Sequence, residues 1–416
     1  MSWGGEMWKD QEVEEIYSRE VERQNRVLRM IPSENIMSDG VRAALGGVFC
    51  NKYAEGYPSA RYYQGQANND AIERLAQSRA CALFGSEHAN VQSYSGSPAN
   101  MAAYMALCAP GDRIMGLGLN SGGHLTHGWK VNFSGKLYAP HRIEVEEGSE
   151  RLNYDRILDM AREVRPRVLF IGTTSYSRVL DFARFREIAD DVGAFLVTDI
   201  AHVAGLVVAG AYPNPVPYAD IVTMTLHKTL RGPRGGMILC RGEHAQAVDR
   251  AVFPGIQGGP HMNQIMALAV ALGEASRPSF KAYGHQVVKN ARCLAECLTD
   301  RGLRIVSGGT DCHMMVVDLR AKGVDGRTAA TALERAGIVC NFNAIPYDPN
   351  PPRRPSGIRL GTPCLTSRGF GEKEMVRVAD WIVGVLDAPE DEANQKKTAD
   401  EIEAFLKAYP ESPVVD

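Results

Sequence analysis

Short apolar runs alternate with amphipathic segments through the middle of the chain, from Arg167 onward. Apolar runs bounded by turn residues are typical of buried strands, and apolar residues at helical spacing are typical of the helices that cover them. The pattern predicts strands at 168–172, 194–199, 219–223 and 237–240, and a helix at 182–191. Such an alternation predicts an α/β fold with a mostly parallel sheet that carries helices on both faces.

The flanking segments predict more helices and a smaller unit at the end of the chain. Helical spacing predicts helices at 9–30, 69–83 and 99–108, and a long helical stretch in pieces over 262–299. The last third predicts an α+β unit with strands at 303–307, 314–319 and 338–341, and helices at 328–336 and 372–386. We therefore expect an N-terminal arm over 1–32, a large domain over 33–280 and a small C-terminal domain over 281–416.

Polar side chains gather where the predicted strands end. Asp199 ends one strand and His202 follows it, Lys228 follows the next strand, and Ser175 and Ser177 follow an earlier one. Because ligands of open α/β sheets bind at the carboxyl ends of strands, we expect these side chains to surround one site.

The segment 220–236 brings Lys228 between a strand and a turn rich in Gly, Pro and Arg. Partial burial and nearby cations lower the pKa of a lysine and make its neutral amine available as a nucleophile. A pyridoxal phosphate (PLP) enzyme needs such a lysine for its Schiff base, and a carboxylate such as Asp199 can pair with the protonated pyridine nitrogen. The alternative is a basic surface loop with Lys228, Arg231 and Arg234 solvated, but the converging strand ends favour the PLP site.

Two segments and one arginine predict anion binding. Ser95-Gly96-Ser97-Pro98 stands between a strand and a helix, where free N–H groups and two hydroxyls can hold a phosphate, although an ordinary helix cap has the same pattern. The glycine-rich loop 253–260 can offer further N–H groups. Arg359 stands in an apolar frame, so it requires either a substrate carboxylate or an internal Asp or Glu as its partner.

Two further stretches contain candidate chemistry. His124 and His127 are three residues apart in a glycine-rich loop with no clear third ligand nearby, so an imidazole stacked on a planar cofactor is favoured over a metal site. The loop 51–65 contains four tyrosines and one carboxylate, Glu55. Such a loop carries binding residues, or its tyrosines simply pack on the core.

Composition narrows the class of protein. The chain of 416 residues is 44% hydrophobic and 23% charged, as in an ordinary globular protein, and its formal net charge of -3 gives no basic field for nucleic acid. No apolar run is long enough to span a membrane, and residues 1–11 lack the apolar core of a signal peptide. The nine cysteines show no repeated close pairs, so we expect reduced thiols and a cytoplasmic protein.

Ten segments, taken together and in order, resemble the serine hydroxymethyltransferase family. The resemblance covers about residues 31–375, and its most specific parts are NKYAEGYP, SGSPAN, GGHLTHG, DIAHVAGL, HKTLRGPRGG, FPGIQGGP and SGIRLGTP. It implies a fold-type I PLP-dependent transferase with a mostly parallel seven-stranded sheet and a smaller C-terminal α+β domain, active as a homodimer or tetramer with shared sites. It also implies that serine and glycine are interconverted by cleavage or formation of the Cα–Cβ bond, with tetrahydrofolate as the one-carbon carrier.

The resemblance also implies a role for each matching residue. For PLP, it implies Lys228 as the Schiff-base lysine, Asp199 on the pyridine nitrogen, His124 stacked on the ring, His202 beside the phenolic oxygen, and Thr174 and His227 as further contacts. The phosphate would be held by Ser95, Gly96 and Ser97, with Tyr53, Gly258 and Gly259 reaching it from the neighbouring subunit. Arg359 and Ser33 would hold the substrate carboxylate, Glu55 would transfer the proton, Tyr63 and Thr225 would complete the catalytic group, and folate would contact Leu119, Gly123, Leu125 and Asn343.

Four departures from the family pattern bear on the substrate. They are Pro32, Trp129-Lys130, Leu226 and Arg353-Arg354-Pro355. The added cations favour a more anionic partner or an altered pocket. The alternative function is therefore a PLP-dependent aldolase or transaldolase, or an α-methylserine hydroxymethyltransferase of specialised metabolism, with altered or absent folate use. A non-enzymatic binding module is opposed by the intact set of Lys228, Asp199, Glu55 and Arg359.

Overall fold

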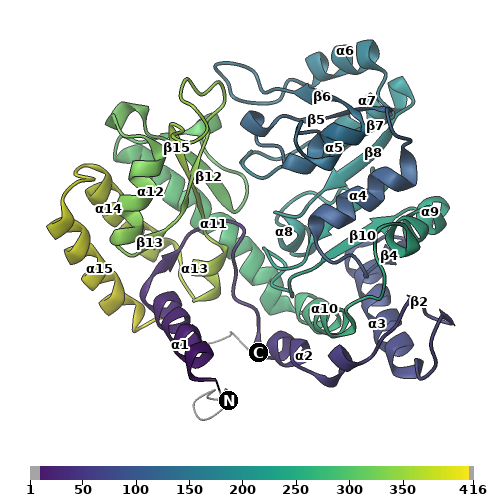
Figure 1. The fold of residues 1–416 in the computed structure, drawn as a ribbon. Coiled ribbons are helices and arrows are strands. Elements are labelled where there is room, and N and C mark those ends of the chain that lie inside the picture. Colours follow the sequence, from purple (N-terminus) through teal and green to yellow (C-terminus); the bar gives the residue numbers. More distant parts are fainter. Residues whose placement is uncertain (1–9, 412–416) are drawn as a thin grey trace.

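A seven-stranded sheet organises the larger half of the molecule (Figure 1). The computed structural model describes residues 10–411. In spatial order the strands are β4 (His88–Asn90), β10 (Gly236–Cys240), β9 (Ile221–Thr225), β8 (Phe195–Asp199), β7 (Val168–Gly172), β5 (Arg113–Leu117) and β6 (Ala139–Ile143). The strands from β9 to β6 are mutually parallel, and β10 alone runs antiparallel to its neighbours. The predicted α/β fold with a mostly parallel sheet is confirmed.

Both faces of this sheet are buried because successive strand residues enter opposite cores. In β10, Met237 and Leu239 join the core on one face, and Ile238 joins the core on the other. In β7, Leu169 and Ile171 lie on the first face and Phe170 on the second. This arrangement explains why the strands read as continuous apolar runs rather than as an alternation of apolar and polar residues.

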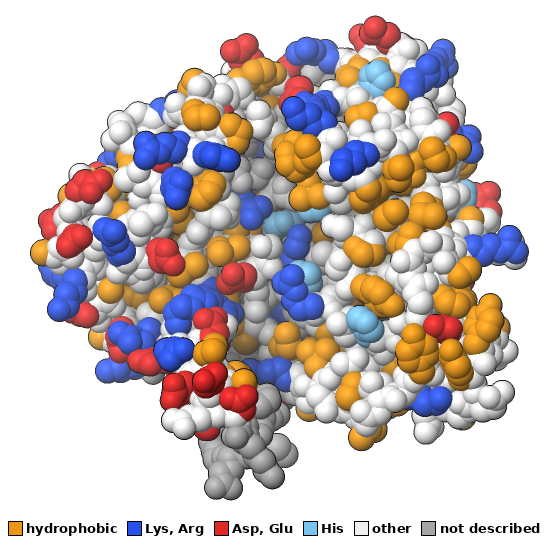
Figure 2. Space-filling view, in the orientation of Figure 1, with side chains coloured by type: hydrophobic (Ala, Val, Ile, Leu, Met, Phe, Trp, Pro, Cys, Tyr) orange, Lys and Arg blue, Asp and Glu red, His pale blue; other side chains and the backbone are white. Residues whose placement is uncertain are grey.

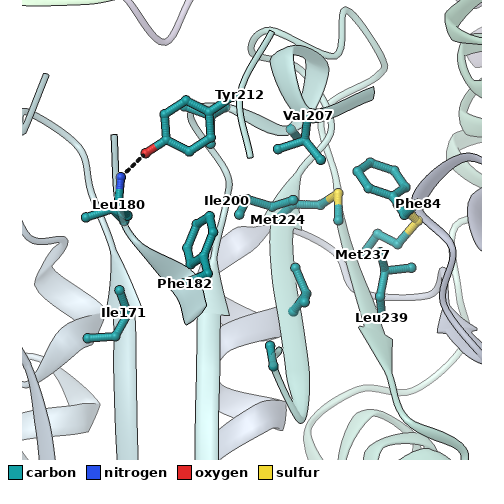
Figure 3. Close-up of a cluster of buried hydrophobic side chains, with 14 of the residues drawn as sticks. Phe84, Ile171, Leu180, Phe182, Ile200, Val207, Tyr212, Met224, Met237 and Leu239 are labelled. Carbon is teal, nitrogen blue, oxygen red and sulfur yellow. Dashed lines mark hydrogen bonds between the residues drawn. The ribbon is translucent and has the colours of Figure 1, made fainter. Parts of the chain in front are cut away.

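Helices cover the two faces unequally. One face packs against α3 (Ala67–Phe84), α6 (Tyr154–Val164), α7 (Phe182–Val192), α8 (Ala204–Val208) and α10 (Met262–Ala275). The other face packs against α4 (Gly96–Leu107) and α9 (Ala245–Arg250). Figure 3 shows the first core, where Met224 lies between Phe182 and Phe84 over the strands, and the Tyr212 hydroxyl accepts the Leu180 N–H at 3.1 Å.

A smaller antiparallel sheet forms the second half, with the order β11 (Arg304–Ile305), β12 (Met314–Asp318), β15 (Gly357–Gly361) and β14 (Asn341–Asn343). Its own core includes side chains from α12 (Gly326–Arg335), α14 (Glu372–Leu386) and α15 (Glu392–Leu406). The long helix α11 (Pro278–Asp300) joins the halves, because Val287 belongs to the first core and Leu294 to the second. The remaining elements are α2 (Asp39–Leu45), α5 (Phe133–Leu137), α13 (Pro363–Ser367), and the strand pair β2 (Gly56–Tyr57) and β3 (Ala60–Arg61).

The N-terminal helix is shorter than its charge and apolar pattern predicts. Helix α1 spans Gln11–Arg26, and the chain then forms β1 (Leu28–Arg29), which pairs in parallel with β13 (Ile338–Val339). The predicted helix over 9–30 is therefore wrong at its C-terminal end, because Leu28 and Met30 are drawn into the core of the smaller half. The domain boundaries themselves stay a prediction.

Within the described range 10–411, no helix combines the length and the apolar character that a bilayer span requires. All nine cysteines are free thiols.

The first prediction concerns a glycine beside the lysine segment. A Cβ on Gly205 in α8 would lie 2.1 Å from the carbonyl oxygen of Thr229, which no side-chain rotation relieves. We expect Gly205→Ala to destabilise the protein by about 1–3 kcal/mol, the usual cost of overpacking. Gly384→Ala is the matched control, because nothing lies within 4 Å of that Cβ on α14 and alanine favours the helix. Urea unfolding of both variants tests this, and equal losses would contradict it.

Candidate active site

The carboxylate of Asp199 lies at the C-terminal end of β8, where three donors surround it. Its Oδ2 accepts from Asn100 Nδ2 at 2.9 Å and faces His127 Nε2 at 3.2 Å, and its Oδ1 accepts the Ala201 N–H at 2.9 Å. Asn100 is held in turn by Thr223 of β9, whose hydroxyl donates to Asn100 Oδ1 at 2.6 Å. The carboxylate is thus fixed by α4, by β9 and by the loop of His127.

Asp199 is anionic in this setting. Burial opposes its charge, but the hydrogen bonds from His127 and Asn100 outweigh burial and hold the pKa of Asp199 well below its usual range. The His127 ring accepts the backbone N–H of His124 on Nδ1 at 3.2 Å, so a neutral ring carries its proton on Nε2 and donates it to Asp199. Asp199 therefore offers a fixed negative charge, as a protonated pyridine nitrogen requires.

Lys228 follows β9, the strand next to Asp199, and is half-buried. Burial lowers the pKa of Lys228 to about 8, Arg359 and Arg234 lower it as well, and Asp199 opposes them. The backbone carbonyl of Lys228 accepts from Asn35 Nδ2 at 2.9 Å, which ties the lysine segment to the N-terminal part of the chain. The interpretation of Lys228 as a solvated residue of a basic surface loop is therefore wrong, although Arg234 in the same segment is exposed.

The start of α4 has the features of an anion cradle. Ser95 is its N-terminal cap residue but makes no side-chain cap hydrogen bond, and neither Ser95 nor Ser97 has a hydroxyl partner in the described part of the chain. The backbone is packed so closely that a Cβ on Gly96 would lie 2.6 Å from a methyl carbon of Thr225. The ordinary helix cap is therefore excluded, and the N–H groups and hydroxyls remain available to an anion.

Arg359 on β15 points from the smaller sheet toward the same region. Its guanidinium donates to Asn341 Oδ1 at 3.1 Å and to the carbonyl oxygen of Thr174, which follows β7. Burial lowers the pKa of Arg359 to about 10, and among residues 10–411 no Asp or Glu forms an ion pair with it. The internal ion pair is excluded as its partner, so Arg359 is free to bind an external carboxylate.

The N-terminal segment that leads to Ser33 packs against the strand of Arg359. Gly361 of β15 donates its N–H to the Met30 carbonyl oxygen at 2.8 Å, and a Cβ on Gly361 would lie 2.6 Å from Pro32. Pro32 therefore packs on the strand of Arg359, so this departure from the family pattern is accommodated by a glycine.

Three predicted histidines near Lys228 are neutral. Burial lowers the pKa of His124 to about 4 and of His227 to about 3, and it lowers the pKa of His202 well below its usual range. The buried Nδ1 of His227 has no hydrogen-bond partner in the described chain. Figure 2 shows basic and histidine side chains along the depression between the two halves of the molecule.

A second group of predicted residues gathers apart from Lys228. A Cβ on Gly259 would lie 3.1 Å from the ring of Tyr53, a Cβ on Gly258 would lie 3.6 Å from Glu55 Oε1, and the rings of Tyr53 and Tyr63 are 5.5 Å apart. In the described residues no hydrogen bond, ion pair or ring contact joins this group to Lys228, Asp199 or Arg359. One chain thus assembles two separate parts of the predicted site.

The loop of Glu55 is held by a buried arginine that the sequence analysis did not single out. Arg61 donates to the carbonyl oxygens of Ala54 at 2.8 Å and Gly56 at 2.7 Å, on either side of Glu55. Arg61 is in turn paired with Asp70 at 2.9 Å and with the fully buried Glu73. The backbone around Glu55 is therefore fixed independently of any ligand.

The predicted folate contacts do not all lie at one cavity. A cavity of about 360 Å³ is lined by Leu119 and His124, together with Trp129, Lys130, Arg142 and Pro352. Leu125 is partly exposed nearby on the same loop, while Gly123 is closed in, because its Cβ would lie 2.0 Å from the Leu117 carbonyl oxygen. Asn343 does not line this cavity, and its amide donates to the Ala344 carbonyl oxygen at 2.7 Å.

The four departures from the family pattern lie in different parts of the structure. Trp129 and Lys130 line the cavity, and Arg353 and Arg354 are exposed beside Pro352. Leu226 does not bear on the site directly. It is buried in the first core, where a Cβ on Gly235 would lie 3.0 Å from its side chain. The expectation that Leu226 alters the substrate pocket is therefore wrong, because its side chain enters the core.

The structure corrects the view that His124 and His127 lack a third potential ligand, because Asp199 brings a carboxylate within 4.8 Å of both rings. Asp199 and His127 are already hydrogen-bonded to each other, and His124 Nδ1 lies 2.7 Å from the Thr126 hydroxyl. His127 thus supports the carboxylate directly, and His124 contributes through the backbone N–H that it donates to His127. The sequence does not indicate this arrangement because Asp199 and His127 are 72 positions apart in the chain.

Asn35 is a further residue near the lysine segment. Its Nδ2 also donates to the Tyr283 hydroxyl at 2.7 Å, and its Oδ1 accepts from Ser367. Asn100 and His313 are parts of the site that the sequence does not indicate, and His127 is indicated there only as a candidate for a stacked ring or a metal ligand. No local pattern distinguishes them, since each is recognised only by a partner far away in the chain.

Comparison with known proteins agrees with this geometry. A sequence profile described as serine hydroxymethyltransferase matches residues 7–382. The chain belongs to the serine hydroxymethyltransferase family. A serine hydroxymethyltransferase of Sorangium cellulosum (strain So ce56) is 52% identical over 401 residues, which cover 96% of this chain and 95% of that protein. One of Acidobacterium capsulatum is 53% identical over 401 residues, covering 96% and 94%.

Membership of the serine hydroxymethyltransferase family makes the protein a PLP-dependent transferase with tetrahydrofolate as co-substrate. The residues present fit PLP. The unpartnered hydroxyls of Ser95 and Ser97 and the free Nδ1 of His227 suit its phosphate, anionic Asp199 suits its pyridine nitrogen, and the amine of Lys228 suits its aldehyde.

The second prediction follows from the lowered pKa of Lys228. The rate at which PLP becomes attached to the apoprotein should rise with pH and level off above about 8, because only the neutral amine attacks the aldehyde. Borohydride fixation and mass spectrometry of the peptide containing Lys228 measure this, with Lys228→Arg as the unlabelled control. A midpoint near 10.4, the value of an ordinary lysine, would contradict it.

Proposed function

We propose that the protein interconverts serine and glycine, with tetrahydrofolate carrying the one-carbon unit. The observation that carries the proposal is the half-buried Arg359, which has no acidic partner among residues 10–411 and lies close enough to Lys228 to lower its pKa. An arginine so placed suits the carboxylate of an amino acid. The two relatives named above are both serine hydroxymethyltransferases, which supports the same substrates here.

Each residue has a physical task in this reaction. When bound, PLP supplies an electron sink for charge that develops at the substrate Cα. Asp199 keeps the pyridine nitrogen protonated, and Lys228 provides the amine to which the cofactor is attached. Arg359 holds the substrate carboxylate, with Ser33 beside it, and thereby determines which Cα bond stands perpendicular to the ring. Glu55 moves a proton to or from the substrate.

Sites shared between two subunits are part of the proposal. Glu55, Tyr53 and Tyr63 lack contact with Lys228 inside one chain, and Tyr53 and Tyr63 are 59% and 45% exposed. Exposed aromatic side chains of this kind mark a protein interface. A second copy of the chain would cover them and would bring Glu55, Tyr53 and the loop of Gly258 and Gly259 to the cofactor held by Lys228.

Use of tetrahydrofolate is favoured over an aldolase without folate. The cavity beside His124 keeps Leu119 on its wall, and Leu226 has no part in it. Lys130 and Arg142 line the same cavity together with one acid, Glu144, and neither cation forms an ion pair within residues 10–411, which suits a co-substrate that carries carboxylates. A cytoplasmic location is supported by nine free cysteines, and the boundary between domains near 280 is supported by the two separate cores that meet along α11.

The third prediction tests the function itself. Exchange of the glycine α-proton with solvent should be stimulated by tetrahydrofolate, because the acceptor completes the site for the hydroxymethyl group. Proton nuclear magnetic resonance follows the exchange, and conversion of serine to glycine is measured alongside. Exchange that is indifferent to tetrahydrofolate would instead support the aldolase.

The fourth prediction concerns Arg359. Arg359→Ala should raise the KM for serine by about a hundredfold or more, because a charge-assisted bidentate contact is lost. The KM of Arg359→Lys should lie between those of the wild type and Arg359→Ala, since lysine keeps the charge but lacks the planar guanidinium. Arg320→Ala is the control, because Arg320 is exposed and paired with Asp318. An unchanged KM for Arg359→Ala would remove the assigned role.

The fifth prediction concerns the shared site. Lys228→Gln and Glu55→Gln should each be inactive alone, but a mixture refolded or exchanged in equal amounts should regain about a quarter of the wild-type activity. Half of the dimers would then pair the two variants, and each would contain one site with both native residues. Failure to regain activity, with mixed dimers demonstrated by mass spectrometry, would place Lys228 and Glu55 in one subunit's site.

A further inference from the structure

Two buried imidazoles meet where the larger and the smaller half face each other. His202 follows β8 of the large sheet, and His313 immediately precedes β12 of the small sheet. His202 Nδ1 lies 3.2 Å from His313 Nε2, with ring centroids 5.4 Å apart. His202 is 3% exposed and His313 is fully buried. This is a direct side-chain hydrogen bond between the two halves, and it lies beside Lys228 and Arg359.

The pair holds one proton between the two facing nitrogens. Burial lowers the pKa of both rings, to about 3 for His313, and the charges of Arg359 and Lys228 lower both further. Two neutral imidazoles in contact must consist of one donor and one acceptor. The open question is therefore which ring donates.

The second ring nitrogen of His313, Nδ1, indicates which ring is the donor. His313 Nδ1 is sealed from solvent and has no hydrogen-bond partner among the described residues. A buried N–H without an acceptor is rare and costly, whereas an unused lone pair is tolerated more easily. Nδ1 is therefore the unprotonated nitrogen, and His313 carries its proton on Nε2 and donates it to His202. His202 then accepts on Nδ1 and carries its own proton on Nε2.

The Nε2 of His202 is the atom that this arrangement makes into a donor. It makes no hydrogen bond inside the described chain, and it is not among the fully buried unpartnered atoms, so it borders open space. Lys228, His313 and Arg359 are the charged and titratable groups that act on the ring most strongly. His202 Nε2 therefore presents its N–H to this open space.

We propose that His313 is a positioning residue that fixes the tautomer of His202, so that His202 Nε2 always presents an N–H to an acceptor oxygen of the bound cofactor. The oxygen that suits it is the phenolic oxygen of PLP, so this assignment rests on the proposed function. The carbonyl oxygen of His313 also accepts the N–H of Thr362, three residues after Arg359, at 3.1 Å. The position of the small sheet therefore fixes both His313, which orients the proton of His202, and Arg359, which is proposed to bind the substrate.

Nuclear magnetic resonance of protein with ¹⁵N-labelled histidine tests the tautomers directly in the apoprotein and in the PLP-bound form. Long-range proton–nitrogen correlations should show His202 and His313 protonated on Nε2 only, with the signals assigned by their loss in His202→Gln and His313→Gln. A wild-type His202 protonated on Nδ1 would overturn the proposal. This measurement needs no activity, so failure of the proposed function would leave it readable.

Variants of His313 test the consequence. His313→Leu removes the donor, and we expect mixed tautomers for His202, PLP binding weakened about tenfold, and a loss in kcat with little change in the KM for serine. His313→Gln retains an N–H near the position of Nε2 and should recover most of the PLP affinity. His285→Leu, on the exposed face of α11, is the control and should match the wild type. Unchanged PLP affinity in His313→Leu, or an equal loss in His313→Gln, would overturn the role.

Discussion

The anionic carboxylate of Asp199 is the constraint on which the rest of the site depends. It is held by Asn100 from α4, by His127 from the loop after β5 and by a backbone N–H, so three parts of the large half converge on one side chain. The negative charge of Asp199 acts on Lys228, and the positive charge of Arg359 acts on Lys228 in the opposite sense. The cluster therefore has an excess of positive charge, which suits a cofactor with a phosphate and a substrate with a carboxylate.

The two halves contribute different functions to this cluster. The large sheet supplies the anion, the amine and the phosphate cradle at the carboxyl ends of its strands, as an open α/β sheet does for its ligand. The small sheet supplies Arg359 and His313, both of which reach across to residues beside Lys228. In the proposed function Arg359 recognises the amino acid, so recognition depends on how the halves are held together, and α11 and the segment of Asn35 hold them.

The sequence predicts those parts of the site that depend on local order. Lys228, Asp199 and the Ser95–Ser97 cradle each follow a strand, and strand ends are recognisable from apolar runs and turns. Arg359 is recognisable because a charge in an apolar frame needs a partner. By contrast, His127 and His313 act through contacts with residues 72 and 111 positions away. Leu226 similarly reads as a substitution near the lysine, although its side chain packs in the core of the large half.

The central claim is that Asp199 keeps the cofactor ring cationic. It is tested most directly by reconstituting the apoprotein with PLP labelled with ¹⁵N in the ring and recording the nitrogen chemical shift between pH 6 and 9. The account predicts the shift of a protonated pyridine nitrogen throughout, and its loss when Asp199 is replaced by alanine. A neutral pyridine shift in the wild-type protein at pH 7 would contradict the account.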